Sequence, residues 1–392
     1  WMKFHRFVLV KTVEEVKDLV DRAIAHGRCA LALETEGFDN RIEYDDAGKP
    51  YTRHKIVGYC VGLKGVGYYI PIRHNYDKVL GEANPNVPLE GTNAEIKRLC
   101  QASQPVLTEA GFKEDPYASM QWETPPRCVI YMWHSKFDQE FLYPVTGIDF
   151  WHPSSFEDGL LAAYVLYTDD SLGLKDKAAE KLSISDPDVK DEQGNPRVYP
   201  YEMIKFEDLF PKGTKKSNMK FANLYPEPGL PMVMYGCSDG ICTELICEAK
   251  RIKVDFAKQP AGYTYNNVLT PIAKGSFVST YKLEKQTVQA VRVMERARAK
   301  VDTEALGGLL EEAREEKKIY QDKITKLAAA KGFPDFNPGS SAQLSEFLFE
   351  SRGLDINPKP EKNESSGQYK TDAATLEAMF EAHPDIEVLA WI

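Results

Sequence analysis

The pattern of hydrophobic and polar residues at the start of the chain predicts a helix followed by three strands. Apolar residues recur at helical spacing over 12–26, and a Thr-x-x-Glu capping box opens this segment. Residues 29–33 form a short apolar run typical of a buried strand. Two further apolar segments, 55–63 and 66–72, are separated by a Lys-Gly turn. We therefore expect an antiparallel meander that includes the first strand.

The next part of the chain mixes both patterns. A second capping box, Thr92 with Glu95, predicts the start of a helix. The apolar run 127–133 predicts a strand, and apolar residues at helical spacing over 137–142 predict a helix directly after it. Further helices are predicted over 156–167, 172–182 and 231–252. Segments rich in turn-forming and polar residues, expected to be loops, are 39–54, 105–126 and 183–228.

The composition changes near residue 255, where a second region begins. Residues 256–281 contain several Pro, Gly and Asn residues, which is typical of a connecting segment. Beyond them the pattern is almost wholly helical, with cap candidates at Asp302 and at Ser340 and a last helix from Asp372. One apolar stripe is typical of an antiparallel helical pair: Leu306, Leu310, Ala313, Tyr320, Ile324 and Leu327. The predicted domains are 1–255, a connection over 256–281, and a helical domain over 282–392.

Composition and charge limit the classes of function that this chain can have. Of 392 residues, 43% are hydrophobic and 28% charged, which suits two or three globular domains. The net charge of −10 argues against gripping duplex nucleic acid by bulk electrostatics. No membrane span or signal peptide is evident, so an intracellular, cytoplasmic protein is expected. The seven cysteines form no Cys-x-x-Cys pair, which favours free thiols over zinc or disulfides.

Acidic residues stand at two predicted strand ends and on one helix. Glu34 and Glu36 end the first strand on one face, where repulsion calls for a cation, although a solvated strand end is the alternative. Asp138 follows the strand at 127–133, where the helix dipole alone could also favour it. Tyr235 and Asp239, four residues apart, share a helix face, although Tyr235 could be an ordinary core or surface tyrosine.

Carboxylates of this kind suit a phosphodiesterase that uses two divalent ions. One ion activates water and the other stabilises the leaving oxygen, and hard oxygen ligands select Mg²⁺ or Mn²⁺. A separate basic patch lies in the long predicted loop and consists of Lys212, Lys215, Lys216 and Lys220. Such a patch is usually a solvated loop, and the alternative is contact with a phosphate backbone.

These residues resemble the three motifs of the DEDD 3′–5′ exonucleases, in the subclass with a tyrosine in the third motif. The matching segments are Glu-x-Glu at 34–36, His-Ser-Lys-Phe-Asp at 134–138 and Tyr-x-x-x-Asp at 235–239. Around them, GYCVGL, YYIPIRH, FEDGLLAAYVL and LGLKDKAAEKL are similar to the proofreading domain of family A DNA polymerases. The Glu295 to Asp302 segment, FNPGSSAQL and the Lys-rich turn before TDAATLEAM follow in family order and resemble the start of the thumb.

The resemblance implies a ribonuclease-H-like α/β domain, with a mixed sheet flanked by helices, followed by an all-α partial thumb-like domain. It implies that Glu34, Glu36 and Asp239 bind a first divalent ion and that Glu34 and Asp138 act on a second. Tyr235 would orient the attacking water. The implied substrate is the 3′ end of single-stranded DNA or of a primer-template, and the implied partners are the remaining polymerase domains of a longer parent or of a separate chain.

Two residues depart from the family pattern. Glu34 stands where the family has Asp, and its extra methylene would displace the bridging carboxylate unless the backbone compensates. A shift of about 1 Å can cost on the order of 100-fold in rate. His134 stands where Asn is usual, which matters less because that residue is not a ligand. Nothing after Asp302 resembles palm or finger motifs, and the apolar end at Leu389 to Ile392 suggests a longer parent, so this chain is not expected to polymerise.

Two rival functions remain open from the sequence. Glu34 would favour a catalytically weak or silent exonuclease fold that binds DNA or braces a polymerase. An exoribonuclease of the same superfamily is the other rival, and the thumb-like region argues against it.

Overall fold

The computed structural model describes residues 6–76, 82–107, 122–150, 152, 154–166, 171–248, 262–265, 268–271, 276–363 and 366–391. It divides into two compact units, Trp1–Arg298 and Ala299–Ile392.

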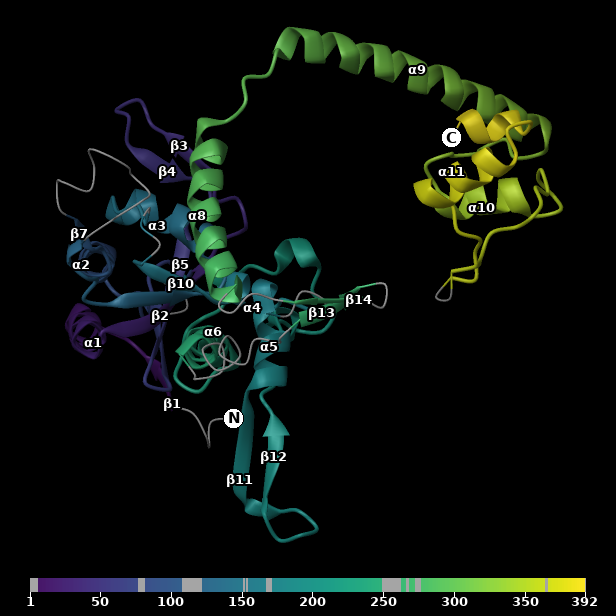
Figure 1. Cartoon of the computed structure of the whole chain (residues 1–392). Coiled ribbons are helices and arrows are strands. Elements are labelled where there is room, and N and C mark those ends of the chain that lie inside the picture. Colours follow the sequence, from purple (N-terminus) through teal and green to yellow (C-terminus); the bar gives the residue numbers. More distant parts are fainter. Residues whose placement is uncertain are drawn as a thin grey trace. The chain divides into compact units, whose positions relative to one another are not determined.

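A six-stranded mixed sheet is the centre of the first unit (Figure 1). In spatial order its strands are β1 (Arg6–Leu9), β6 (Val66–Pro71), β5 (Ile56–Leu63), β2 (Arg28–Thr35), β9 (Val129–Met132) and β10 (Phe156–Asp158). Strand β5 runs antiparallel to β2 and β6, whereas the pairs β1–β6, β2–β9 and β9–β10 are parallel. The predicted meander is confirmed, and so is the ribonuclease-H-like mixed sheet.

Helices cover both faces of this sheet, and the strand residues alternate between them. The helices are α1 (Val13–His26), α2 (Leu89–Ala102), α3 (Ser135–Thr146), α4 (Gly159–Leu166), α5 (Leu174–Lys181) and α6 (Pro231–Glu248). Leu31 and Tyr59 pack in the core that holds α1 and α2. Ala32 and Cys60, one position further along each strand, pack in the core that holds α6. Because side chains alternate along a strand, Glu34 takes the α6 side, like Ala32.

Glycines allow α6 to lie directly on the sheet. A Cβ atom added at Gly62 would come within 2.1 Å of the Gly240 carbonyl oxygen, and one added at Gly67 would come within 2.6 Å of the Cys237 carbonyl oxygen. Larger residues on either side would push the helix away. In addition, the carboxylate of Glu244 accepts the backbone N–H groups of Lys64 and Gly65 in the turn between β5 and β6. The distance between α6 and β5 is therefore set by contacts between their backbones.

Several elements differ from the sequence-based expectation. Helix α2 begins at Leu89, because the buried Thr92 hydroxyl donates to the Pro88 carbonyl inside the helix and does not cap it. Residues 156–158 pair with β9 as a strand before α4 begins. The expected loop over 183–228 contains a hairpin of β11 (Ser183–Lys190) and β12 (Pro196–Pro200), which extends away from the sheet (Figure 1).

Shorter elements complete the first unit. Its paired short strands are β3 (Ile42–Tyr44) with β4 (Pro50–Thr52), β7 (Val106–Leu107) with β8 (Trp122–Thr124), and β13 (Gly262–Tyr265) with β14 (Val268–Pro271). Its 3₁₀ helices are η2 (Phe206–Leu209), η3 (Lys216–Asn218) and η4 (Phe221–Asn223). The part of the helix predicted over 249–252 lies outside the described residues.

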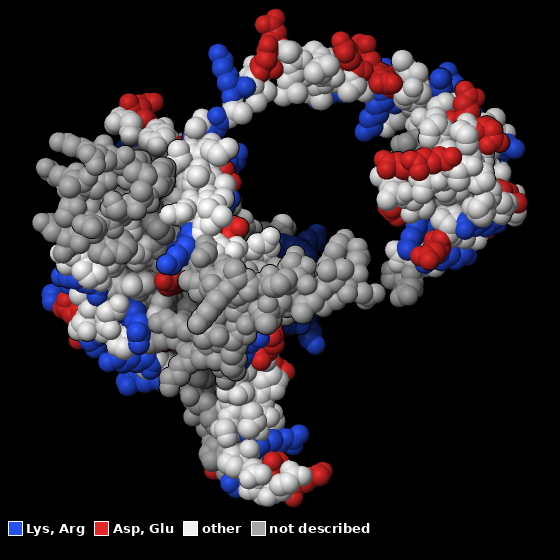
Figure 2. Space-filling view, in the orientation of Figure 1, with Lys and Arg blue, Asp and Glu red and all other residues white. Residues whose placement is uncertain are grey.

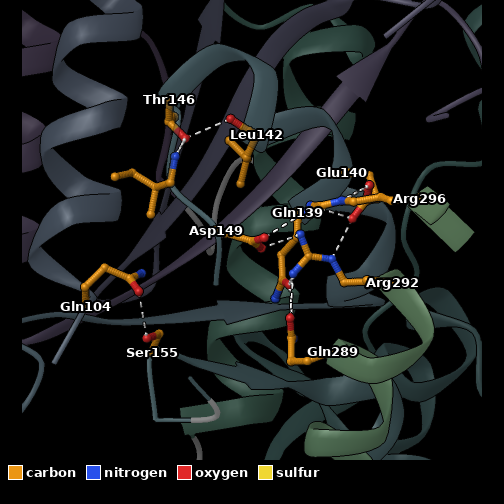
Figure 3. A network of polar contacts seen from close by, with 11 residues as sticks. Gln104, Gln139, Glu140, Leu142, Thr146, Asp149, Ser155, Gln289, Arg292 and Arg296 are labelled. Carbon is orange, nitrogen blue, oxygen red and sulfur yellow. Dashed lines mark hydrogen bonds and ion pairs between the residues drawn. The ribbon is translucent and has the colours of Figure 1, made fainter. Parts of the chain in front are cut away.

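Helix α8 (Ser276–Ala297) belongs to the first unit, so the division of the chain falls after Arg298 and not at the expected boundary of 281 and 282. The physical reason is a buried polar network with α3 (Figure 3). Arg292, 2% exposed, donates to Glu140 at 2.6 Å and to Gln139. Arg296 bonds both Glu140 and Asp149. The buried Arg292 and the half-buried Arg296 would lose these partners if the helix separated from this unit.

The second unit is helical, with a small core of its own. It contains α9 (Thr303–Ala330), α10 (Ser341–Phe349), α11 (Ala373–Ala382) and the 3₁₀ helix η5 (Glu387–Trp391). The expected caps Asp302, Ser340 and Asp372 each accept a backbone N–H. On α9, Ile324 is buried, but Leu306 and Leu310 are 55% and 48% exposed. Acidic and basic side chains are interspersed along the same helix (Figure 2). The expected helical pair stays a prediction.

Candidate active site

Glu34 is a buried carboxylate near the end of β2. It is 8% exposed and lies on the α6 side of the sheet. The pairing with β5 changes register just after Glu34, since Glu34 pairs with Gly58 and Thr35 with Ile56. The thiol of Cys60, on the neighbouring strand, donates to Glu34 Oε1 at 3.9 Å. The side chain of Glu34, which is longer than the Asp of the family pattern, thus contacts Cys60.

Helix α6 brings Asp239 and Tyr235 to the same place. The Asp239 carboxyl group lies close enough to that of Glu34 for its charge to raise the pKa of Glu34. Tyr235, one helical turn earlier, is partly buried, and its ring packs against Phe206 and Phe221 at centroid distances of 6.3 and 5.8 Å. The close packing of α6 against β5 positions both residues. Both residues lie on one helix, α6, as the sequence predicts, and their roles in a reaction stay a prediction.

Asp138 reaches the same region from α3. The residue that opens this helix, His134, has a left-handed backbone with φ of 70°. Asp158, at the end of β10, accepts the N–H groups of His134 and Ser135 at 3.3 and 2.7 Å and so caps the helix. Asp138 then falls in the first turn and is 5% exposed. Strand β9 leads into α3, and β10 supplies the carboxylate that caps this helix. The two adjacent parallel strands together therefore fix the position of Asp138.

The three acids, of which Glu34 and Asp138 are buried and Asp239 is half-buried, form a group with excess negative charge. Burial, followed by the charge of Asp239, raises the pKa of Glu34 well above its ordinary value. Burial, followed by the charges of Asp158 and Asp239, raises the pKa of Asp138 in the same way. Burial also raises the pKa of Asp239 to about 6, against the opposing effect of Lys175. Burial and like charges disfavour ionisation, and a bound cation would reverse both effects.

The donor set fits a hard divalent cation. Three carboxylates offer the oxygen ligands that Mg²⁺ and Mn²⁺ prefer, and their raised pKa values indicate a site short of positive charge. Among the described residues, however, no three or more His, Cys, Asp or Glu side chains are already placed around a single point as a ligand set. The three acids nevertheless influence one another electrostatically from three separate elements.

Glu36 and the lysine patch are placed apart from this group. Strand β2 ends at Thr35, and Glu36 is exposed, with its carboxylate accepting the Lys55 N–H at 3.1 Å. No printed contact among the described residues links Glu36 to Glu34, and its role as a ligand stays a prediction. The four patch lysines are exposed in and around η3, and their contact with DNA also stays a prediction: Lys212, Lys215, Lys216 and Lys220.

Two residues of this site were not anticipated from the sequence. Lys175, in the first turn of α5, places its Nζ 4.4 Å from the centre of the Tyr235 ring. Cys60 contacts Glu34, as described above. No sequence pattern distinguishes a lysine that starts a polar helix from an ordinary surface lysine. Only the position of the segment LGLKDKAAEKL between the second and third motifs could have drawn attention to it.

Comparison with known proteins supports the resemblance seen in the motifs. No protein-family model matches the chain. Over 106 residues the chain is 34% identical to the thermostable DNA polymerase I of Thermus thermophilus, and 35% identical to that of Thermus aquaticus. Each match covers 27% of this chain and 12% of the relative. The chain therefore matches about an eighth of the length of these curated relatives, and the predicted similarity to family A polymerases is confirmed over that stretch.

The similarity of the chain to solved structures is weaker. The polymerase domain of Pol1 from M. smegmatis, in complex with DNA primer-template and dNTP, is 16% identical with a TM-score of 0.44, covering 96% of this chain and 46% of that one. The catalytic core of RRP6 from Trypanosoma brucei is 13% identical with a TM-score of 0.42, covering 88% and 71%. Such low scores carry no conclusion on function. In the described residues, no helix is long and apolar enough to cross a membrane.

Proposed function

We propose that the first unit is a 3′–5′ exonuclease that removes nucleotides from the 3′ end of DNA, as the proofreading portion of a family A DNA polymerase. The observation that carries this proposal is that Glu34, Asp138 and Asp239 come from three separate elements and influence one another electrostatically, the first two of them being buried. The segments that hold them match the exonuclease motifs in order. The similarity to the DNA polymerase I enzymes of Thermus supports the same assignment.

In this proposal the acids hold two divalent ions, Mg²⁺ or Mn²⁺. When bound, the ions supply an activated water and stabilise the leaving 3′ oxygen. Glu34, Glu36 and Asp239 would bind the first ion, and Asp138, with Glu34, the second. Burial of Glu34 and Asp138 keeps water from competing for their oxygens and strengthens their attraction for a cation.

Tyr235 has the role of orienting the attacking water. Burial, followed by the charges of Asp239 and Glu34, raises the pKa of its phenol, so the hydroxyl stays protonated at neutral pH. A neutral phenol can donate one hydrogen bond and accept another, which suits holding a water without binding the metal. The packing of its ring against Phe206 and Phe221 limits its rotation. The substrate is the 3′ end of single-stranded DNA or a frayed primer-template, with the remaining polymerase domains as partners.

The test is a product ladder from 5′-labelled substrates. Single-stranded DNA, RNA of the same sequence and a mismatched primer-template are incubated with the chain in Mg²⁺ or Mn²⁺. Stepwise shortening of both DNA substrates from the 3′ end supports the proposal. Preferential shortening of RNA would assign the chain to the exoribonucleases instead.

A second candidate function is a silent exonuclease fold that binds DNA or braces a polymerase. Two observations favour it: the described acids are not placed as a ligand set, and Glu34 stands where the exonuclease motif has Asp. Binding of DNA without shortening in either metal would establish this alternative.

A further inference from the structure

Lys175 contacts the one aromatic residue of the proposed reaction centre. It lies in the first turn of α5 and is half-buried, and α5 packs against α6. Its Nζ is 4.4 Å from the centre of the Tyr235 ring, within the range of a cation–π interaction. A half-buried ammonium group that faces a half-buried tyrosine loses part of its hydration. This location therefore needs compensating negative charge nearby.

The compensating charge comes from the acids of the site. The positive charge of Lys175 attracts both Glu34 and Asp239. Tyr235 and Asp239 are one turn apart on α6, so a single side chain from α5 can serve both. By contrast, Lys181 on the same helix is paired with Glu180 at 2.6 Å. Only one end of α5 thus faces the acids.

We propose that Lys175 is a positioning residue of the active site, a built-in cation that orients Tyr235 and offsets the negative charge of Glu34 and Asp239. This inference rests on the proposed function, because it concerns the same site. It gives the site a fixed charge that opposes a divalent cation. Lys175 then weakens the affinity for the ion while it holds the side chains in place for the reaction.

The first experiment measures ion affinity rather than activity. Mn²⁺ is titrated calorimetrically into the wild type, K175M, K175R and the matched control K181M. Removal of one positive charge near a bound divalent ion is expected to tighten Mn²⁺ binding on the order of 10-fold in K175M. K175R keeps the charge and is expected to bind Mn²⁺ as the wild type does, as is K181M. A purely structural lysine would not tighten binding, so unchanged or weaker binding in K175M would overturn the inference.

The second experiment needs no metal and separates this inference from the proposed function. Urea unfolding in EDTA is measured for the wild type, K175M, D239N and the double variant. If Lys175 offsets the charge of Asp239, K175M lowers the unfolding midpoint in the wild-type background and much less in the D239N background. Equal losses in both backgrounds would refute the coupling. If K175M does not fold, K175Q replaces it in the same cycle.

The outcomes can be told apart. A wild type that binds no Mn²⁺ at millimolar concentration contradicts the proposed function, and the metal-free cycle still decides whether Lys175 is coupled to Asp239. A wild type that binds Mn²⁺ while K175M binds equally well contradicts the role of Lys175 and leaves the exonuclease proposal standing.

Discussion

The side chain of Glu34 on β2 lies near that of Asp239 on α6, and the charge of Asp239 adds to burial in raising the pKa of Glu34. Burial also raises the pKa of Asp239, so both neighbouring acids favour the protonated form in the absence of a cation. A bound divalent ion would favour the ionised form of both acids instead. This competition between protons and a cation has measurable consequences.

Removing the charge of Asp239 should stabilise the metal-free protein at neutral pH. Its folded-state pKa of about 6 is above the ordinary value of 3.8. For a raised acid pKa, the stabilising contribution is fully present below about pH 4 and is lost as the pH rises through about 6. In EDTA, the difference in Tm between Asp239→Asn and the wild type should thus grow from near zero at pH 4 to about 5 °C at pH 7.5. Differential scanning calorimetry over this range measures it, and a pH-independent difference would contradict the account.

Shortening Glu34 to Asp should weaken the site, although Asp is the family residue. In this chain the longer side chain reaches both the Cys60 thiol and Asp239. Glu34→Asp withdraws the carboxylate by about 1 Å, which predicts a loss on the order of 10- to 100-fold in the single-turnover rate of DNA shortening. Glu36→Asp makes the same shortening at an exposed position. Its effect on the same single-turnover rate tests the ligand role proposed for Glu36. A faster Glu34→Asp variant would show that the extra methylene is a handicap.

The α8 network should contribute strongly to the stability of the first unit. Arg292 and Glu140 are 2% and 6% exposed and bonded at 2.6 Å. Arg292→Met leaves Glu140 with a buried charge and one fewer partner, which predicts a loss of about 3 kcal/mol in the free energy of unfolding. Arg314→Met, which breaks an exposed pair with Glu311, should cost less than about 1 kcal/mol. Urea unfolding of the two variants compares them, and equal losses would contradict a special role for this network.

The location of the acids could be anticipated because each belongs to a local pattern. Glu34 and Asp138 follow apolar strands, and Asp239 shares a helix face with Tyr235. Strand ends and helix faces are short-range properties, so the sequence reveals them. The order of the motifs then predicted that they would meet.

Other features depend on partners that are distant in sequence. Glu140 alternates with apolar residues on α3 in a way that suits a surface position, and only its bonds to Arg292 and Arg296 explain its burial. Residues 156–158 form a strand because β9 offers a free edge, which no local pattern shows. Lys175 likewise gains its place from the packing of α5 on α6.

The most direct test of the central claim is the single-turnover cleavage of a 5′-labelled single-stranded DNA by the wild type and by Asp138→Asn in Mn²⁺, with the fold of both verified by circular dichroism. The account predicts stepwise 3′ shortening by the wild type and a loss of at least about 100-fold in Asp138→Asn, because a ligand to one ion is removed. Equal rates for the two proteins, or binding of the DNA without shortening by the wild type, would contradict it.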